Sequence, residues 1–185
     1  DVHFRRGLSC AGCHGGDPAA GMDHDFPETW PDTSKKRHGD RKWVPGFCAS
    51  CHSDAAFMRQ YDPDLPTDQF DKYKESRHGM TLLTGKNTHA AECTSCHGVH
   101  GIQGPNSPES HVYPMNVPAT CGARHADPEG MAGVKLPDGS PIPTDQYEKY
   151  RDSVHGRALL EKGDIGAPAC NDCHGNHAAM PPEIA

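Results

Sequence analysis

The chain has too few apolar side chains to build an ordinary hydrophobic core. Hydrophobic residues make up 34% of its 185 residues and aromatic residues only 6%, whereas globular domains usually have about 45–50% apolar residues. Glycine and proline are abundant instead, with 20 and 17 residues. Such a composition is typical of a disordered chain, unless something other than side chains supplies the core.

Positive charge and long apolar runs are also lacking. The chain has 18 Lys and Arg against 25 Asp and Glu, a net charge of −7 with neutral histidine. This balance speaks against nucleic acid as a partner and permits docking to a basic patch on another protein. There is no apolar run of 18 residues and no signal peptide, so we expect no transmembrane segment in this chain. We expect a mature or trimmed chain, whose membrane link, where there is one, comes from a missing segment or a partner.

Cysteine does not occur outside one recurrent pattern, Cys-x-x-Cys-His. We number its five stretches I to V in chain order: 10–14, 48–52, 93–97, 121–125 and 170–174. The pattern is the attachment sequence of c-type haem, in which two thiols add to the porphyrin vinyl groups and the histidine ligates the iron. A single Cys-x-x-Cys is shared with thioredoxin-like and zinc sites. Neither of these gives a reason for a histidine after every pair, so the repeated pattern indicates haem.

The motifs predict both the covalent and the proximal iron ligands. Thioether bonds are expected from Cys10, Cys13, Cys48, Cys51, Cys93, Cys96, Cys121, Cys170 and Cys173, and proximal ligation from His14, His52, His97, His125 and His174. Motif IV has Arg124 where the second cysteine belongs. We expect a fifth haem there, attached through Cys121 alone; the alternatives are a lost haem and an error at position 124. Because the motifs use all nine cysteines, we predict no disulfides.

The second half of the chain repeats the first. The stretch 66–73 matches 143–150 at an offset of 77, which also relates motif III to motif V, while an offset of 73 relates motif II to motif IV. This duplication defines unit 1 (48–100) and unit 2 (121–177), each with two motifs joined by a linker, after a first-haem segment (1–47). We treat 1–185 as one domain. In the linkers, apolar spacing predicts helices over 67–83 and 144–161 with Thr67 and Thr144 as N-caps.

Nine histidines remain outside the motifs as candidates for the distal position of each iron. Those in the repeated Ser-x-His-Gly and His-Gly-x-His contexts, or in the similar Arg-His-Gly context, are the preferred set: His38, His78, His100, His155 and His177. The glycine after His78 and His155 is expected to give a porphyrin room to approach. The second set is His3, His24, His89 and His111. His100 and His177 lie three residues after a proximal histidine, which favours ligation of a neighbouring haem.

These contexts resemble the multihaem c-type cytochromes of respiring bacteria, in the cytochrome c3-like and doubled-CxxCH group. The stretches that carry the resemblance are 10–17, 73–79, 93–100, 150–156 and 170–177, which span nearly the whole chain. The resemblance implies bis-histidine electron carriers with closely stacked haems. Relatives act as periplasmic shuttles, as subunits of quinol-oxidising membrane complexes or as extracellular filaments. They often carry further motifs after a segment like 170–177, which leaves open a further C-terminal part.

The resulting expectation is a mainly α protein with extensive irregular loops and little or no sheet, wrapped around a stack of haems that serve as its core. Its apo chain should be largely unfolded, because cofactor binding and folding are coupled. We predict electron transfer rather than enzyme activity, in an exported protein of the periplasm or cell surface. Other redox proteins, a quinol-oxidising complex or identical subunits in a filament are the expected partners. The rival function is a multihaem reductase with one open iron site, for which motif IV is the candidate.

Overall fold

The computed structural model describes residues 1–14 and 41–181, and this part of the chain is mainly helical. Its elements are α1 (Val2–Arg5), α2 (Cys10–His14), α3 (Trp43–His52), α4 (Ala55–Met58), α5 (Gln69–Glu75), α6 (Arg77–Leu83), α7 (Cys93–His97), α8 (Val117–His125), α9 (Gln146–Asp152), α10 (Val154–Gly156), the π-helical turn η2 (Arg157–Glu161) and α11 (Cys170–His174). Extended pairing within the described ranges is limited to one bridge between Lys135 and Pro141. The prediction of a mainly α fold with little or no sheet is confirmed.

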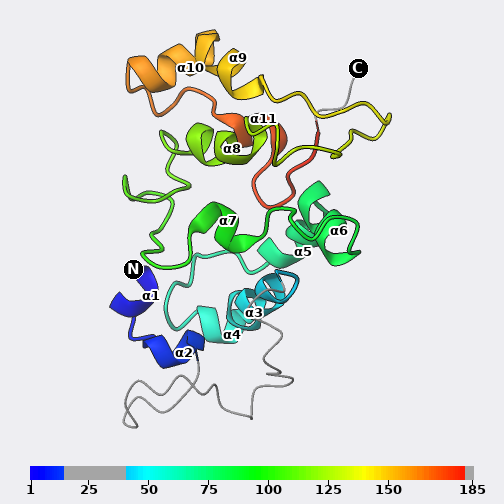
Figure 1. The fold of residues 1–185 in the computed structure, drawn as a ribbon. Coiled ribbons are helices and arrows are strands. Elements are labelled where there is room, and N and C mark those ends of the chain that lie inside the picture. Colours follow the sequence, from blue (N-terminus) through cyan, green and yellow to red (C-terminus); the bar gives the residue numbers. More distant parts are fainter. Residues whose placement is uncertain (15–40, 182–185) are drawn as a thin grey trace.

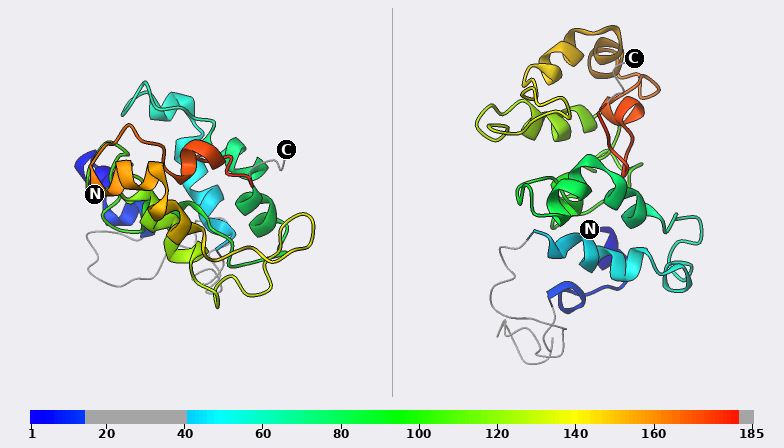
Figure 2. Two further views of the ribbon diagram at one scale, coloured as in Figure 1. Left: turned by 90° about the horizontal axis from the view of Figure 1, so that it is seen from above. Right: turned by 90° about the vertical axis from the view of Figure 1, so that its right-hand side faces the viewer.

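The short helices form an elongated column in which unit 1 occupies one half and unit 2 the other (Figure 1). Helix α2 lies at one end, α3 and α4 come next, and α7 lies in the middle. Helices α8 and α11 follow, with α9 and α10 at the far end; the right-hand view of Figure 2 shows the same order. Unit 2 is therefore stacked on unit 1 along one axis, as in repeat proteins.

The first linker contains two short helices, α5 and α6, and the second contains α9 and α10, which continues into η2; neither is the single helix that we predicted over 67–83 and 144–161. Ser76 separates α5 from α6: its backbone is extended, and its hydroxyl accepts from the Gly79 amide (2.9 Å) while donating to the Tyr73 carbonyl (2.7 Å). Ser153 breaks the second linker in the same way. A serine that caps a helix favours a new start over continuation. The predicted caps Thr67 and Thr144 are also wrong, because α5 and α9 begin after Asp68 and Asp145.

The glycine of the Ser-x-His-Gly sequence is required by this break. A Cβ atom on Gly79 would lie 1.9 Å from the Tyr73 carbonyl oxygen, and one on Gly156 would lie 2.0 Å from that of Tyr150. Both distances are far inside van der Waals contact, so only glycine lets the second helix fold back against the first. The structure thus gives a backbone reason for a glycine that we had interpreted as clearance for a porphyrin.

Side chains alone form only a small core. Among the described residues, the buried hydrophobic positions are Met58, Tyr73, Leu82, Val117, Met131, Leu159 and Ala169. Leu82 and Leu159, which are repeat counterparts, are fully buried. In unit 2 a cluster of Val117, Leu159 and Ala169 packs next to Cys121 and Cys170. The core therefore gathers beside the cysteine motifs. In the described part of the chain, no helix is both long enough and apolar enough to cross a membrane.

Candidate functional site

Every motif is helical from its first cysteine to its histidine. Motifs I, III and V are the short helices α2, α7 and α11, and motifs II and IV are the C-terminal ends of α3 and α8. In a helix, positions i, i+3 and i+4 share one face. The two cysteines and the histidine of motifs II, III and V therefore point to the same side of one turn, as attachment to a single flat group requires.

A buried carboxylate starts the helix of motif III. Glu92 is the N-cap of α7, and its side chain, 3% exposed, accepts from the Thr94 amide at 2.7 Å. In return the Ser95 hydroxyl accepts from the Glu92 amide at 3.1 Å. Arg41 pairs with the Glu92 carboxylate at 3.0 Å and also donates to Ser95. These reciprocal bonds satisfy amides that a helix start leaves free.

Unit 2 starts the equivalent helix with a different residue. Its counterpart of Glu92 is Ala169, and its counterpart of Ser95 is Asp172. The Asp172 carboxylate accepts from the Ala169 amide at 2.7 Å. The carboxylate is therefore at the N-cap in unit 1 and in the first turn of the helix in unit 2, where a negative charge also interacts favourably with the helix dipole.

Replacing Glu92 with alanine is expected to destabilise the protein by about 1–3 kcal/mol, through loss of the cap and of the partner of Arg41. The double variant Glu92→Ala/Ser95→Asp recreates the arrangement of unit 2 and should recover part of this loss. Denaturant unfolding of the protein measures both. Equal stability of the wild-type and Glu92→Ala proteins would contradict the assigned role.

The first cysteines of the two motifs in each unit meet. Cys48 lies beside Cys93 in unit 1, and Cys121 lies beside Cys170 in unit 2. The neighbouring Cys121 thiol lowers the pKa of Cys170 to about 7. All nine cysteines are free thiols in this structure. Because α3 also packs on α7, and α8 on α11, the two motifs of a unit lie side by side.

Three of the motif histidines each face one histidine from elsewhere in the chain. The ring centres are 5.9 Å apart for His3 and His52, 6.0 Å for His78 and His125, and 6.1 Å for His97 and His177. Two imidazoles that bind one metal from opposite sides, at about 2 Å each, have ring centres about 6 Å apart. Ordinary ring contacts span the same range. What distinguishes these pairs is their composition, since each joins one motif histidine to one outside the motifs.

Specific backbone bonds bring the outer histidines into place. Helix α1, which carries His3, is tied to the loop after unit 1 by the Val2 amide donating to the Ile102 carbonyl at 2.7 Å. The Ile102 amide in turn donates to the Asp1 carboxylate at 3.1 Å. His177 lies in the segment after motif V, which the Arg77 amide holds against α6 by donating to the Ala179 carbonyl at 3.0 Å.

The tyrosines of the linkers hold the approaches to motifs III and V. The Tyr73 hydroxyl donates to the Ala91 carbonyl and the Tyr150 hydroxyl to the Pro168 carbonyl, each at 2.9 Å. Both acceptors lie two residues before a motif. The separation between donor and acceptor is 18 residues in both units, and this preserved spacing is a signal in the sequence that could have identified the bond.

Burial keeps the paired histidines neutral. Desolvation, with a smaller contribution from His125, lowers the pKa of His78 to about 4. The pKa of His97 is likewise lowered to about 4, first by burial and then by the neighbouring His177. Burial is also the main cause of the lowered pKa values of His3, His52, His125 and His177. The neutral imidazole is the form that binds metal ions.

The other predicted ligands are placed differently. His100, His155 and His174 are exposed, and the Nδ1 atom of His174 is 3.0 Å from the Met180 carbonyl. The ring of His111 lies over Gly98, beside motif III, and His89 is exposed on a turn. His24 and His38 lie outside the described residues. Within the described ranges, no three side chains among His, Cys, Asp and Glu gather into a metal site.

Motif IV retains the geometry of its counterparts despite Arg124. Cys121 faces Cys170 as Cys48 faces Cys93, and His125 faces His78. Arg124 Nη1 lies 3.1 Å from the point that a side chain on Gly130 would occupy, beside the Asp127 carboxylate. The guanidinium therefore reaches the residues after the helix, and the thiol and the imidazole of motif IV remain available.

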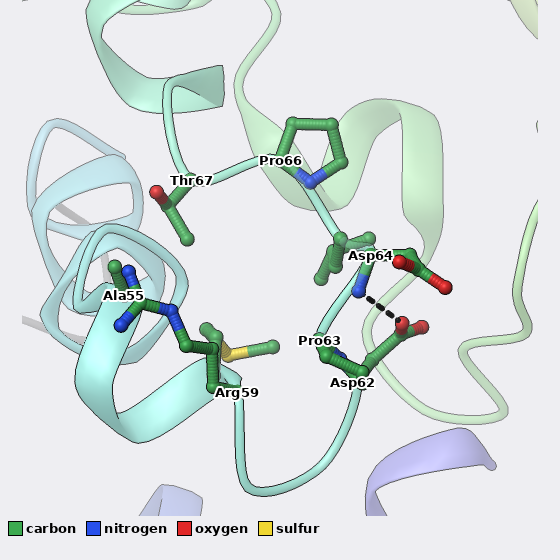
Figure 3. Close-up of a pocket in the computed structure, with 9 residues that line it drawn as sticks. Ala55, Arg59, Asp62, Pro63, Asp64, Pro66 and Thr67 are labelled. Carbon is green, nitrogen blue, oxygen red and sulfur yellow. Dashed lines mark hydrogen bonds between the residues drawn. The ribbon is translucent and has the colours of Figure 1, made fainter.

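The hollow drawn in Figure 3, of about 280 Å³, lies apart from the motifs between α4 and the start of α5. Its lining includes Arg59 and an Asx turn in which the Asp64 amide donates to the Asp62 carboxylate at 3.2 Å. None of its nine lining residues is a motif cysteine or histidine. A second hollow, of about 320 Å³, borders motif V and is lined by Val117, Ala169 and Asn171 among others.

Comparisons with protein-family models, curated proteins and solved structures each gave no match to this chain.

Proposed function

We propose that this protein is a multihaem c-type cytochrome that transfers electrons through five covalently attached haems. The observation that carries the proposal is the set of three histidine pairs, each made of one motif histidine and one distant histidine about 6 Å away. A porphyrin supplies four equatorial ligands, so a haem iron needs only two from the protein. The pairs meet this need, and the adjoining cysteines provide the covalent attachment.

The pairs assign a distal ligand to three motifs. His3 serves motif II, His78 serves motif IV and His177 serves motif III. The sequence pattern extends this assignment to motif I. His177 follows motif V and serves motif III, which is two motifs earlier. His100 is its unit 1 counterpart and follows motif III, so it would serve motif I. Two neutral imidazoles on one iron favour a low potential.

We include motif IV because His78 lies beside its histidine and its cysteine is a free thiol. Cys121 would form one thioether bond, and His125 and His78 would take the axial positions. The buried state of His78, whose pKa is lowered to about 4, keeps it ready for this role at neutral pH. A haem there would lie between those of motifs III and V and keep the series continuous.

The haem iron supplies reversible one-electron reduction, and the protein sets its ligands, spacing and exposure. The motif helices are spread along the column, with α2 at one end, α3 and α7 next, and α8 beside α11 towards the other end (Figure 1). Such a series is suited to carrying electrons between partners at its two ends. We propose other redox proteins, or a quinol-oxidising membrane complex, as these partners. Covalent haem attachment also implies an exported protein, of the periplasm or the cell surface.

The mass of the intact protein tests this proposal. We expect the mass of the polypeptide plus five haems, whereas a mass with four haems would remove motif IV from the scheme. A mass without haem in cells competent for c-type maturation would refute the proposal as a whole.

Two cysteine variants serve as a matched pair in this measurement. Cys121→Ser should lower the covalent count by one, because motif IV has no second thiol. Cys173→Ser should leave the count unchanged, since Cys170 still forms one bond in motif V. A covalent haem retained in Cys121→Ser would show that motif IV is not attached through this residue.

A further inference from the structure

Three contacts join unit 2, with the segment that follows it, to unit 1. His125, the first motif histidine of unit 2, lies beside His78, and His177 lies beside His97. Beside them, the Arg77 amide donates to the Ala179 carbonyl. Unit 1 therefore contributes three groups to its contact with unit 2: a histidine outside the motifs (His78), a motif histidine (His97) and the backbone amide of Arg77.

Unit 2 has the same three groups on its own outer side. The offset of 77 carries His78 to His155, His97 to His174 and Arg77 to Val154. His155 is exposed and Val154 is 76% exposed. Within the described residues, no histidine ring is paired with His155 or His174, and no carbonyl accepts from the Val154 amide. The Nδ1 atom of His174 faces the Met180 carbonyl, which leaves Nε2 for a metal.

We propose that these groups form a coordination surface for another haem-bearing unit of the same design. That unit supplies a histidine to the distal position of the motif V iron, as His177 does for motif III. Its own first haem takes His155 as distal ligand, as motif IV takes His78. This inference rests on the proposed function and adds that His155 ligates no iron of motifs I to V.

The occupant is a unit outside residues 1–185 and not a second copy of them. A second copy would have to present the iron of its motif II to His155. In this chain His3 already faces His52, and α1 is anchored there by the Val2 and Ile102 bonds. Its first unit is therefore covered on the side that such a contact would need.

Spectroscopy of the haem-loaded chain 1–185 tests the inference, with added imidazole as the probe for a histidine ligand. We expect one five-coordinate, high-spin haem, which imidazole converts to a low-spin form. The double variant Cys170→Ser/Cys173→Ser cannot attach haem V and should lose this signal. His155→Ala should have the same spin states as the unmodified chain, whereas His78→Ala should gain one further high-spin haem.

Other outcomes would overturn the inference. A fully low-spin chain in which His155→Ala creates a high-spin haem would show that His155 ligates an iron within 1–185. A fully low-spin chain unaffected by His155→Ala would show that another histidine of this chain fills motif V. A high-spin signal that appears only on dilution would identify a second copy as the occupant. No change in His78→Ala would instead refute the pairing on which the proposed function stands.

Discussion

Replacing His78 with alanine is expected to leave the protein folded with one more high-spin haem than before, at motif IV. His78 is the ring that faces His125, at 6.0 Å between ring centres. Alanine removes the imidazole that the structure pairs with that motif histidine, so the iron of the proposed haem would become five-coordinate. The reduced variant should then bind one more equivalent of carbon monoxide than the unmodified protein. Optical and electron paramagnetic resonance spectra, with a carbon monoxide titration, measure the change.

His89→Ala is the control for this experiment. His89 is exposed and has no histidine counterpart in unit 2, and its backbone amide donates to the Asn87 side chain at 2.8 Å. Its replacement should leave all spin states unchanged. Added imidazole should restore the low-spin spectrum of His78→Ala, which separates a missing ligand from misfolding. An unaltered spectrum in His78→Ala would contradict the pairing with His125.

The sequence predicts the motifs and the repeated histidines well because both are local patterns. His78 and His177 were in the preferred set on account of their repeated contexts, and each lies beside a motif histidine. His3 was in the second set because nothing in its neighbours resembles Ser-x-His-Gly. Its place depends on bonds to Ile102, about a hundred residues away in the chain. Spacing was the available signal, since His3 precedes His52 by 49 residues and His78 precedes His125 by 47.

In the linkers, the sequence pattern predicts helix but misses where the helix is interrupted. Apolar periodicity predicts that the polypeptide is helical there, and it is, but periodicity is insensitive to a single break. The break depends on a serine hydroxyl that replaces one backbone bond and on a glycine that permits close approach. His155 also shows that matching sequence contexts do not ensure matching surroundings, because its counterpart His78 is covered by unit 2 while His155 is exposed.

The second large effect is expected from Gly79→Ala, which should destabilise the haem-loaded protein by about 2–4 kcal/mol. The new Cβ atom would lie 1.9 Å from the Tyr73 carbonyl oxygen, which belongs to the backbone and cannot rotate away. Helix α6 must therefore shift from α5, and the Ser76 hydrogen bonds at the break must lengthen. Gly156→Ala should have a similar cost, since its Cβ atom would lie 2.0 Å from the Tyr150 carbonyl oxygen.

Gly46→Ala is the matched control, because nothing lies within 4 Å of its added Cβ atom in α3. Alanine in a helix interior should stabilise the protein there by up to about 1 kcal/mol. Denaturant unfolding compares the three variants, and equal stability of Gly79→Ala and Gly46→Ala would show that the close contact does not govern the fold. Since His78 precedes Gly79 directly, a shift of α6 should also move its imidazole away from His125. A high-spin signal in Gly79→Ala but not in Gly46→Ala would therefore connect the backbone break to ligation at motif IV.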